Sequence, residues 1–120
     1  PAIAHVDLLI VNEGEAADLG GVDAIRAGGA HEVVVTLGSR GARAGGVVVP
    51  SPPITAVDAT GAGDAFCAAL TLAIVEGQDL RAATRFATAT GAAACLHRGA
   101  ADAMPTRAEV ERLLADTGMS

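Results

Sequence analysis

Two short apolar runs constrain this chain more than any other feature. Residues 6–11 and 32–37 are nearly continuous stretches rich in Val, Leu and Ile. Such runs are typical of strands that are covered on both faces, as in parallel sheets. Two short helical patterns separate them, one ending near residue 19 and one over residues 21–27. This alternation predicts a three-layer α/β fold with a mostly parallel sheet.

The rest of the chain continues the pattern with one hairpin and three helices. Residues 42–49 are predicted to form the hairpin, around two adjacent glycines. The helices are predicted to run from a Gly-rich turn to residue 76, over residues 80–96 with Asp79 as N-cap, and onward from Thr106. The residues expected to face the core from the first and the last of these helices are Phe66, Leu70, Ile74, Val110, Leu113 and Leu114.

The composition excludes two broad classes of partner. Among the hydrophobic residues 28 are Ala, and the only aromatic residues are two Phe. The formal charge is −6, and all eight cationic residues are Arg. An acidic chain with so few aromatics lacks the basic field and the stacking platforms of a nucleic-acid-binding protein. No stretch of about 18 apolar residues is free of charges, Gly and Pro, so we expect no membrane span.

The two cysteines are not expected to form a disulfide. Cys67 and Cys95 lie in Ala-rich segments without a Cys-x-x-Cys spacing. We expect free, buried thiols in a protein of the reducing cytoplasm. The three histidines are scattered along the chain, so no zinc site is expected.

The motif with the clearest chemistry is the turn at residues 58–64, Asp-Ala-Thr-Gly-Ala-Gly-Asp. Its glycines let a ligand approach the backbone, and the helix that follows directs unpaired amides and its positive dipole end into the turn. Gly61, Ala62 and Gly63 are therefore candidates for an anion hole around phosphate oxygens. Asp64 stands beside them, where a carboxylate can accept a proton from an attacking hydroxyl. The structural alternative is that the two carboxylates of the motif only complement the helix dipole and cap the turn.

Two further polar segments follow the predicted strands. Asn12 and Glu15 come after the first strand, where an amide and a carboxylate can hold a hydrated Mg²⁺. The alternative there is an Asn turn followed by a solvated Glu on a helix. Residues 36–41, Thr-Leu-Gly-Ser-Arg-Gly, follow the second strand and suit contact with a nucleotide, the alternative being a hairpin turn with an exposed Arg. Ligands of open α/β sheets bind at the carboxyl ends of the strands, so the three segments are expected to converge.

These motifs, in this order, resemble the ribokinase (phosphofructokinase-B) family of carbohydrate kinases. Residues 58–66 are similar to the family signature Asp-Thr-Thr-Gly-Ala-Gly-Asp-x-Phe, with Ala59 in place of the first Thr. Asn12 and Glu15 match the family's Asn-x-x-Glu motif, and residues 36–41 resemble its nucleotide loop. The similarity covers most of the chain and is strongest to the ribokinase branch of the family.

The resemblance implies how the chain is divided. Residues 1–120 are expected to form a single C-terminal, ATP-binding and catalytic segment of a three-layer α/β/α ribokinase-like fold. The family's N-terminal part, which carries the sugar pocket and a lid, is not represented among these residues. We therefore expect that these residues alone do not phosphorylate a sugar, and that the full-length protein is a homodimer.

The resemblance also implies a role for each matching residue. Asp64 is implied to be the base that deprotonates the sugar hydroxyl, beside the anion hole. ATP and Mg²⁺ are implied as cofactors, and a monovalent cation, usually potassium, as an activator. The implied ATP-site residues are Asn12, Glu15, Thr36, Gly38, Ser39, Arg40, Gly41, Gly63 and Thr88. The implied cation ligands are the carboxylate of Asp58 and the backbone carbonyls of Thr60, Ala94, His97 and Gly99.

The implied reaction is phosphoryl transfer from ATP to a hydroxyl of a small sugar, with ribose giving ribose 5-phosphate as the first expectation. Such a transfer needs positioning and charge neutralisation more than covalent chemistry. Three alternatives stay open: a family kinase for another sugar or a nucleoside, a truncated nucleotide-binding fragment without catalysis, and a split enzyme completed by another chain. The residues that choose the sugar belong to the family's N-terminal part.

Overall fold

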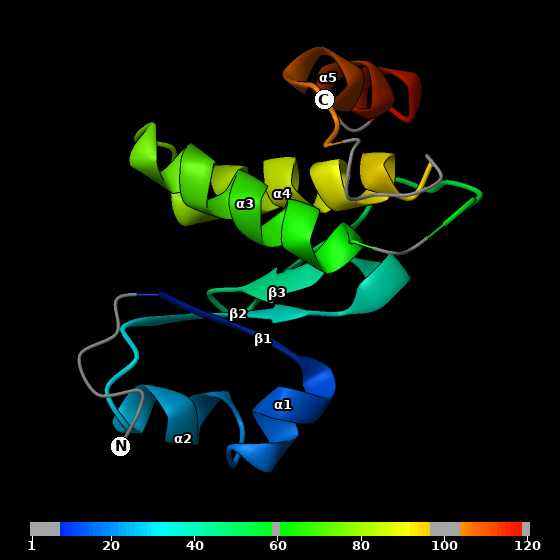
Figure 1. The fold of residues 1–120 in the computed structure, drawn as a ribbon. Coiled ribbons are helices and arrows are strands. Elements are labelled where there is room, and N and C mark those ends of the chain that lie inside the picture. Colours follow the sequence, from blue (N-terminus) through cyan, green and yellow to red (C-terminus); the bar gives the residue numbers. More distant parts are fainter. Residues whose placement is uncertain (1–7, 59–60, 97–103, 119–120) are drawn as a thin grey trace. The chain divides into compact units, whose positions relative to one another are not determined.

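The chain forms two compact units, Pro1–Val49 and Pro50–Ser120. They are described here from a computed structural model, which places residues 8–58, 61–96 and 104–118. Within these residues the first unit, called the sheet unit, contains the four strands and two short helices. The second, called the helical unit, contains three longer helices (Figure 1).

The sheet unit begins with a strand, two helices and a parallel strand. Its elements in chain order are β1 (Leu8–Asn12), α1 (Glu13–Asp18), α2 (Val22–Ala27), β2 (Glu32–Thr36), the 3₁₀ turn η1 (Gly38–Arg40), β3 (Ala42–Ala44) and β4 (Val47–Val49). The sheet order is β1-β2-β3-β4. Strand β1 pairs with β2 in parallel, whereas β2 with β3 and β3 with β4 pair antiparallel. The α/β class and the hairpin are therefore as predicted.

Fewer strands of the sheet pair in parallel than the sequence predicted. Of the three pairings among the described residues, only that of β1 with β2 is parallel. The reason lies in the length of the connections, because a parallel neighbour needs a crossover of a dozen or more residues. Two helices fill the connection from β1 to β2, but only short turns join β2 to β3 and β3 to β4.

The core of the sheet unit lies between β2 and the helices of one sheet face. Val33 and Val35 point to the same face, since side chains alternate along a strand. They form one buried cluster with Ala16 of α1 and Ile25 of α2. Helices α1 and α2 accordingly lie on the same face of the sheet (Figure 1).

The helical unit consists of α3 (Ala62–Val75), α4 (Leu80–Ala94) and α5 (Arg107–Asp116). The Asp79 side chain accepts the Ala82 N–H at 2.8 Å, which confirms the predicted N-cap of α4. Thr106 caps α5 and forms a capping box with Glu109. Helices α3 and α4 run side by side (Figure 1). The buried side chains that join α5 to α4 are Ala89, Ala93, Val110 and Leu114.

Two side chains of α3 lie where the sequence analysis did not place them. Ile74 is 37% exposed, and the buried residues of the last turns are Leu70 and Ala73. A spacing of four residues advances about 40° beyond a full turn at each step, so the third member leaves the buried face. The prediction of a buried Cys67 is also wrong, because this residue faces solvent, whereas Cys95 is half-buried. Both thiols are free, as predicted.

The assigned core of the sheet unit predicts a large difference between two apolar truncations. Ile25→Ala should lower the free energy of unfolding by about 2–5 kcal/mol, because it removes a fully buried side chain and leaves a cavity. Leu19→Ala is the matched control, since Leu19 is 47% exposed in the same unit. Chemical denaturation followed by circular dichroism measures both. Equal losses for the two variants would contradict this core.

Candidate functional site

The residue before α3 adopts the left-handed backbone conformation. Gly61 has φ +80° and ψ 0° and precedes Ala62, the first residue of the helix. Glycine adopts this conformation without steric cost. The Gly61 carbonyl accepts the Ala65 N–H at 2.9 Å and so closes the first turn. The N–H groups of Ala62, Gly63 and Asp64 have no acceptor within the helix, as in the first turn of any α-helix.

This first turn is open at the positions that the predicted chemistry needs. A Cβ atom added to Gly63 would meet no atom within 4 Å among the described neighbours. Asp64 is exposed, so its carboxylate lies outside the packed interior. A negative charge in the first turn is stabilised by the helix dipole. The turn thus combines an exposed glycine, Gly63, with an exposed carboxylate, Asp64.

The end of α4 is bonded to the segment that enters the Gly-rich turn. The Cys95 carbonyl accepts the Val57 N–H at 2.7 Å and the Asp58 N–H at 3.0 Å. Burial raises the pKa of the Cys95 thiol, and the negative charge of Asp58 raises it further. Asp58 and Ala94, two of the predicted cation ligands, therefore belong to one local structure. The other three, Thr60, His97 and Gly99, lie outside the described residues.

Limited hydration and the charge of Asp64 raise the pKa of a neighbouring thiol, that of Cys67. Cys67 follows Asp64 by three residues on α3 and faces solvent. Neighbouring protein atoms limit the hydration of this thiol and raise its pKa, and the Asp64 charge raises it further. Cys67 therefore carries less thiolate at neutral pH than an ordinary cysteine.

Asn12 and Glu15 form a capping box at the start of α1. The Asn12 Oδ1 atom accepts the Glu15 N–H at 2.8 Å, and the Glu15 Oε1 atom accepts the Asn12 N–H at 2.9 Å. Both side chains are exposed. The structural alternative of an Asn turn followed by a solvated Glu on a helix is therefore realised. The Mg²⁺ role stays a prediction.

The register of the sheet brings two predicted site residues together. Asn12 and Thr36, the last residues of β1 and β2, are Cα partners in the parallel pair. The Thr36 hydroxyl donates to the Val11 carbonyl at 3.4 Å. The polar segments that follow β1 and β2 therefore lie together at one edge of the sheet. Their convergence with the Gly-rich turn stays a prediction.

The loop after β2 is a tight turn that depends on two glycines. Gly38 has φ +62° and Gly41 has φ +107°, so both positions favour glycine. The Leu37 N–H donates to the Gly41 carbonyl at 2.8 Å, and the Gly41 N–H donates to the Gly38 carbonyl at 3.1 Å. Gly38 and Ser39 are exposed, whereas Gly41 is buried.

Two predicted ATP-site side chains already have protein partners. Arg40 forms an ion pair with Glu13 of α1, and both side chains are more than half exposed. The sequence did not reveal this pair, because its members are 27 positions apart. Thr88 is buried in α4, and its hydroxyl donates to the Arg85 carbonyl at 2.9 Å. Their roles at ATP stay predictions.

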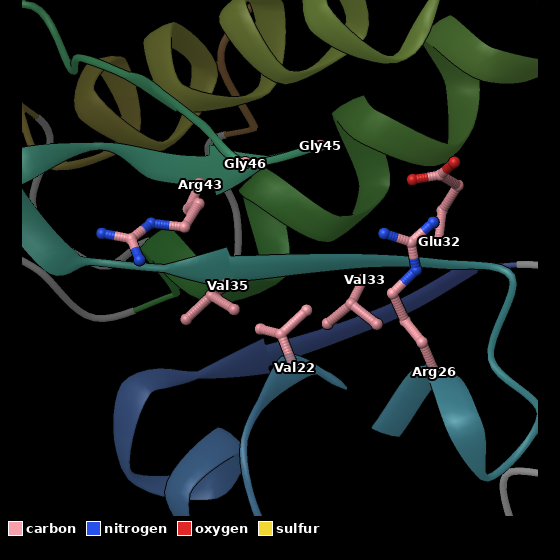
Figure 2. Close-up of a pocket in the computed structure, with 8 residues that line it drawn as sticks. All are labelled: Val22, Arg26, Glu32, Val33, Val35, Arg43, Gly45 and Gly46. Carbon is pink, nitrogen blue, oxygen red and sulfur yellow. The ribbon is translucent and has the colours of Figure 1, made fainter. Parts of the chain in front are cut away.

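A groove on the sheet unit lies outside the predicted site (Figure 2). Its lining residues are Val22, Arg26, Glu32, Val33, Val35, Arg43, Gly45 and Gly46. None of them belongs to the Asn-x-x-Glu motif, the loop after β2 or the Gly-rich turn. Within residues 8–58, 61–96 and 104–118, no three His, Cys, Asp or Glu side chains gather as a metal site would require. In the same part of the chain, no helix has the length and apolarity needed to cross a membrane.

The predicted residues are thus distributed over the two units. The sheet unit contains Asn12, Glu15, Thr36 and the loop after β2, and the helical unit contains the Gly-rich turn and α4. Sequence reasoning missed Gly91 of α4, which lies against the start of α3. The available signal was an isolated glycine inside an Ala-rich helix, which points to a packing or functional reason.

Comparisons with known proteins agree on one family. Residues 1–107 match the family described as pfkB family carbohydrate kinase. Ribokinase of Bacillus subtilis is 46% identical over 87 residues, which are 69% of this chain and 30% of that protein. The chain therefore spans well under half the length of this relative.

Solved structures give the same result for the fold. The crystal structure of ribokinase from Thermotoga maritima matches with a TM-score of 0.84 and 30% identity, over 94% of this chain and 43% of that one. Arabidopsis thaliana ribokinase, solved with ribose and ATP, matches with a TM-score of 0.77 and 32% identity, over 93% and 42% of the two chains. The ribokinase-like α/β fold is thereby confirmed. Together with the match over most of its length, this shows that the chain belongs to the pfkB family of carbohydrate kinases.

Proposed function

We propose that this chain is the C-terminal, ATP-binding and catalytic part of an ATP-dependent sugar kinase. The observation that carries the proposal is the first turn of α3, where the exposed Asp64 and the open backbone at Gly63 are adjacent. A general base next to an anion-binding backbone suits the transfer of a phosphoryl group to a hydroxyl. Membership of the pfkB family supports the same class of reaction.

In the proposed reaction Asp64 accepts the proton of the attacking sugar hydroxyl. The hydroxyl oxygen bonds to the γ-phosphorus of ATP, the bond from that phosphorus to the β–γ bridging oxygen breaks, and ADP leaves with the electron pair. The Gly61–Gly63 segment faces the negative charge on the transferring group, where backbone amides stabilise it. Because the transition state is loose, the hydroxyl keeps its proton until late in the transfer, and the Asp64 carboxylate then accepts it.

The sheet unit is proposed to hold the nucleotide. Thr36 ends β2, and Gly38 and Ser39 are exposed on the loop that follows. Arg40 would reach ATP by exchanging its partner Glu13 for a phosphate oxygen. The match to a ribokinase solved with ribose and ATP supports this assignment.

The residues present suit the two cations of the proposal. Only the Oε1 atom of Glu15 takes part in the capping box, so the carboxylate has a second oxygen for a water of hydrated Mg²⁺. Mg²⁺ would neutralise phosphate charge during transfer. The Asp58 carboxylate and the Ala94 carbonyl are oxygen donors of the kind that potassium prefers. Phosphofructokinase-2 of Escherichia coli, solved with potassium, matches this chain with a TM-score of 0.79 and 28% identity.

Ribose is the proposed acceptor, because a ribokinase is 46% identical to this chain. Another sugar is one alternative, favoured by 36% identity to rice fructokinase-1 over 92% of the chain. A nucleoside is the other, favoured by the match to Burkholderia thailandensis nucleoside kinase, solved with inosine, with a TM-score of 0.79 and 31% identity. Release of ADP by the complete protein with ribose, fructose or inosine separates these acceptors. ATP binding without turnover of any acceptor would instead favour a non-catalytic nucleotide-binding fragment.

Loss of the proposed base should slow the chemical step. In the complete enzyme, Asp64→Asn should lower kcat by about 10²- to 10⁴-fold, because the amide accepts no proton. Coupled measurement of ADP release gives kcat, and titration calorimetry gives the affinity for ATP. Asp23→Asn is the matched control, since Asp23 is an exposed carboxylate in the first turn of α2. Near-full activity of Asp64→Asn would remove Asp64 from this role.

Loss of the proposed cation ligand should change the response to salt. Asp58→Ala should abolish activation by potassium chloride, because it removes the charged oxygen donor. Initial rates over a potassium series at constant ionic strength measure the response, and Asp58→Asn tests the charge with little change in shape. Asp116→Ala, an exposed carboxylate on α5, serves as control. An unchanged potassium dependence in Asp58→Ala would refute the assignment.

A further inference from the structure

The last turn of α4 contacts the beginning of α3. Gly91 is buried in α4, and a Cβ atom added to it would lie 3.3 Å from the Ala62 carbonyl oxygen and 3.8 Å from the Phe66 Cβ atom. The nearer atom belongs to the backbone of the residue with which α3 begins. It cannot rotate away as a flexible side chain would, so a larger residue at position 91 must displace the start of α3.

The end of α4 also forms hydrogen bonds with the residues where the Gly-rich turn begins. The Cys95 N–H donates to the Gly91 carbonyl at 3.3 Å, so these two residues are one helical turn apart. The Cys95 carbonyl accepts the N–H groups of Val57 and Asp58 at 2.7 and 3.0 Å. The end of α4 therefore contacts the Gly-rich turn at two places, Asp58 and Ala62.

From this double contact we infer that Gly91 is a positioning residue, whose missing side chain sets where the first turn of α3 lies. The inference rests on the proposed function, because that turn carries the Gly63 amide and the Asp64 carboxylate. Glycine lowers the stability of a helix interior relative to alanine. Its place within an Ala-rich helix is explained by this close approach to backbone.

A control is needed that disturbs the packing of α4 without changing its contact with α3. Ala93 provides the comparison, because it is a buried small residue of the same turn of α4. It belongs to the buried cluster with Val110 and Leu114 of α5. Leucine at position 93 overfills the α4–α5 contact, whereas leucine at position 91 overfills the α3–α4 contact.

The first test compares Gly91→Leu with Ala93→Leu in the complete enzyme. Gly91→Leu should lower kcat and kcat/KM together, on the order of 100-fold, because a displacement near 1 Å misaligns reacting groups by that much. Gly91→Ala, which needs a shift of only a few tenths of an ångström, should restore most of the activity. Ala93→Leu should lower the melting temperature and leave kcat near the wild-type value. Equal loss of kcat in both leucine variants, or wild-type kcat in Gly91→Leu, would overturn the inference.

The second test does not depend on turnover. The Ala65 N–H bonds to the Gly61 carbonyl and closes the first turn of α3. Gly91→Leu should reduce the hydrogen-exchange protection of this amide at least tenfold, and Ala93→Leu should leave it unchanged. Unchanged protection in Gly91→Leu would overturn the inference, even if the wild-type protein shows no kinase activity and the proposed function fails. If Gly91→Leu does not fold, Gly91→Ala takes its place in this test. We expect Gly91→Ala to lose part of the hydrogen-exchange protection at the Ala65 amide. Full protection of that amide would overturn the inference.

Discussion

The contact between the last turn of α4 and the first turn of α3 is the interaction on which the candidate chemistry of the helical unit depends. Gly61, in the left-handed conformation, precedes α3. Helix α4 approaches the start of α3 so closely that Gly91 lies against the backbone of Ala62. The Cys95 carbonyl holds Asp58 at the other end of the same motif. A residue without a side chain is therefore required at position 91, where the two helices meet at backbone distance.

In the sheet unit the corresponding constraint is the parallel register of β1 and β2. Because the two strands run in the same direction, their carboxyl ends meet, and Asn12 lies beside Thr36. A polar segment follows each strand: α1 follows β1, and the glycine-dependent loop at Gly38 follows β2. Two motifs separated by more than twenty residues thereby share one edge of the sheet, as ligand-binding edges of α/β proteins do.

Several candidate residues serve local structure as well as the proposed chemistry. Asn12 and Glu15 cap α1 through each other's N–H groups, and Arg40 pairs with Glu13. These contacts fix the start of α1 and join it to the loop after β2, near the carboxyl ends of the two strands. Asp64 likewise has a local role, because its charge complements the dipole of α3 in the helix's first turn.

The sequence by itself determined the type and order of the elements, the cap at Asp79 and the family, because periodicity, capping and motif spacing are local properties of the chain. The periodicity also gave the buried positions Phe66, Leu70, Val110 and Leu114, and the tertiary structure decided the others. Ala73 rather than Ile74 faces inward on α3, and Gly91 lies against Ala62. It also decided that Arg40 pairs with Glu13 and that β2 pairs antiparallel with β3. These outcomes depend on contacts between residues far apart in the chain, whose geometry is set by how whole elements pack.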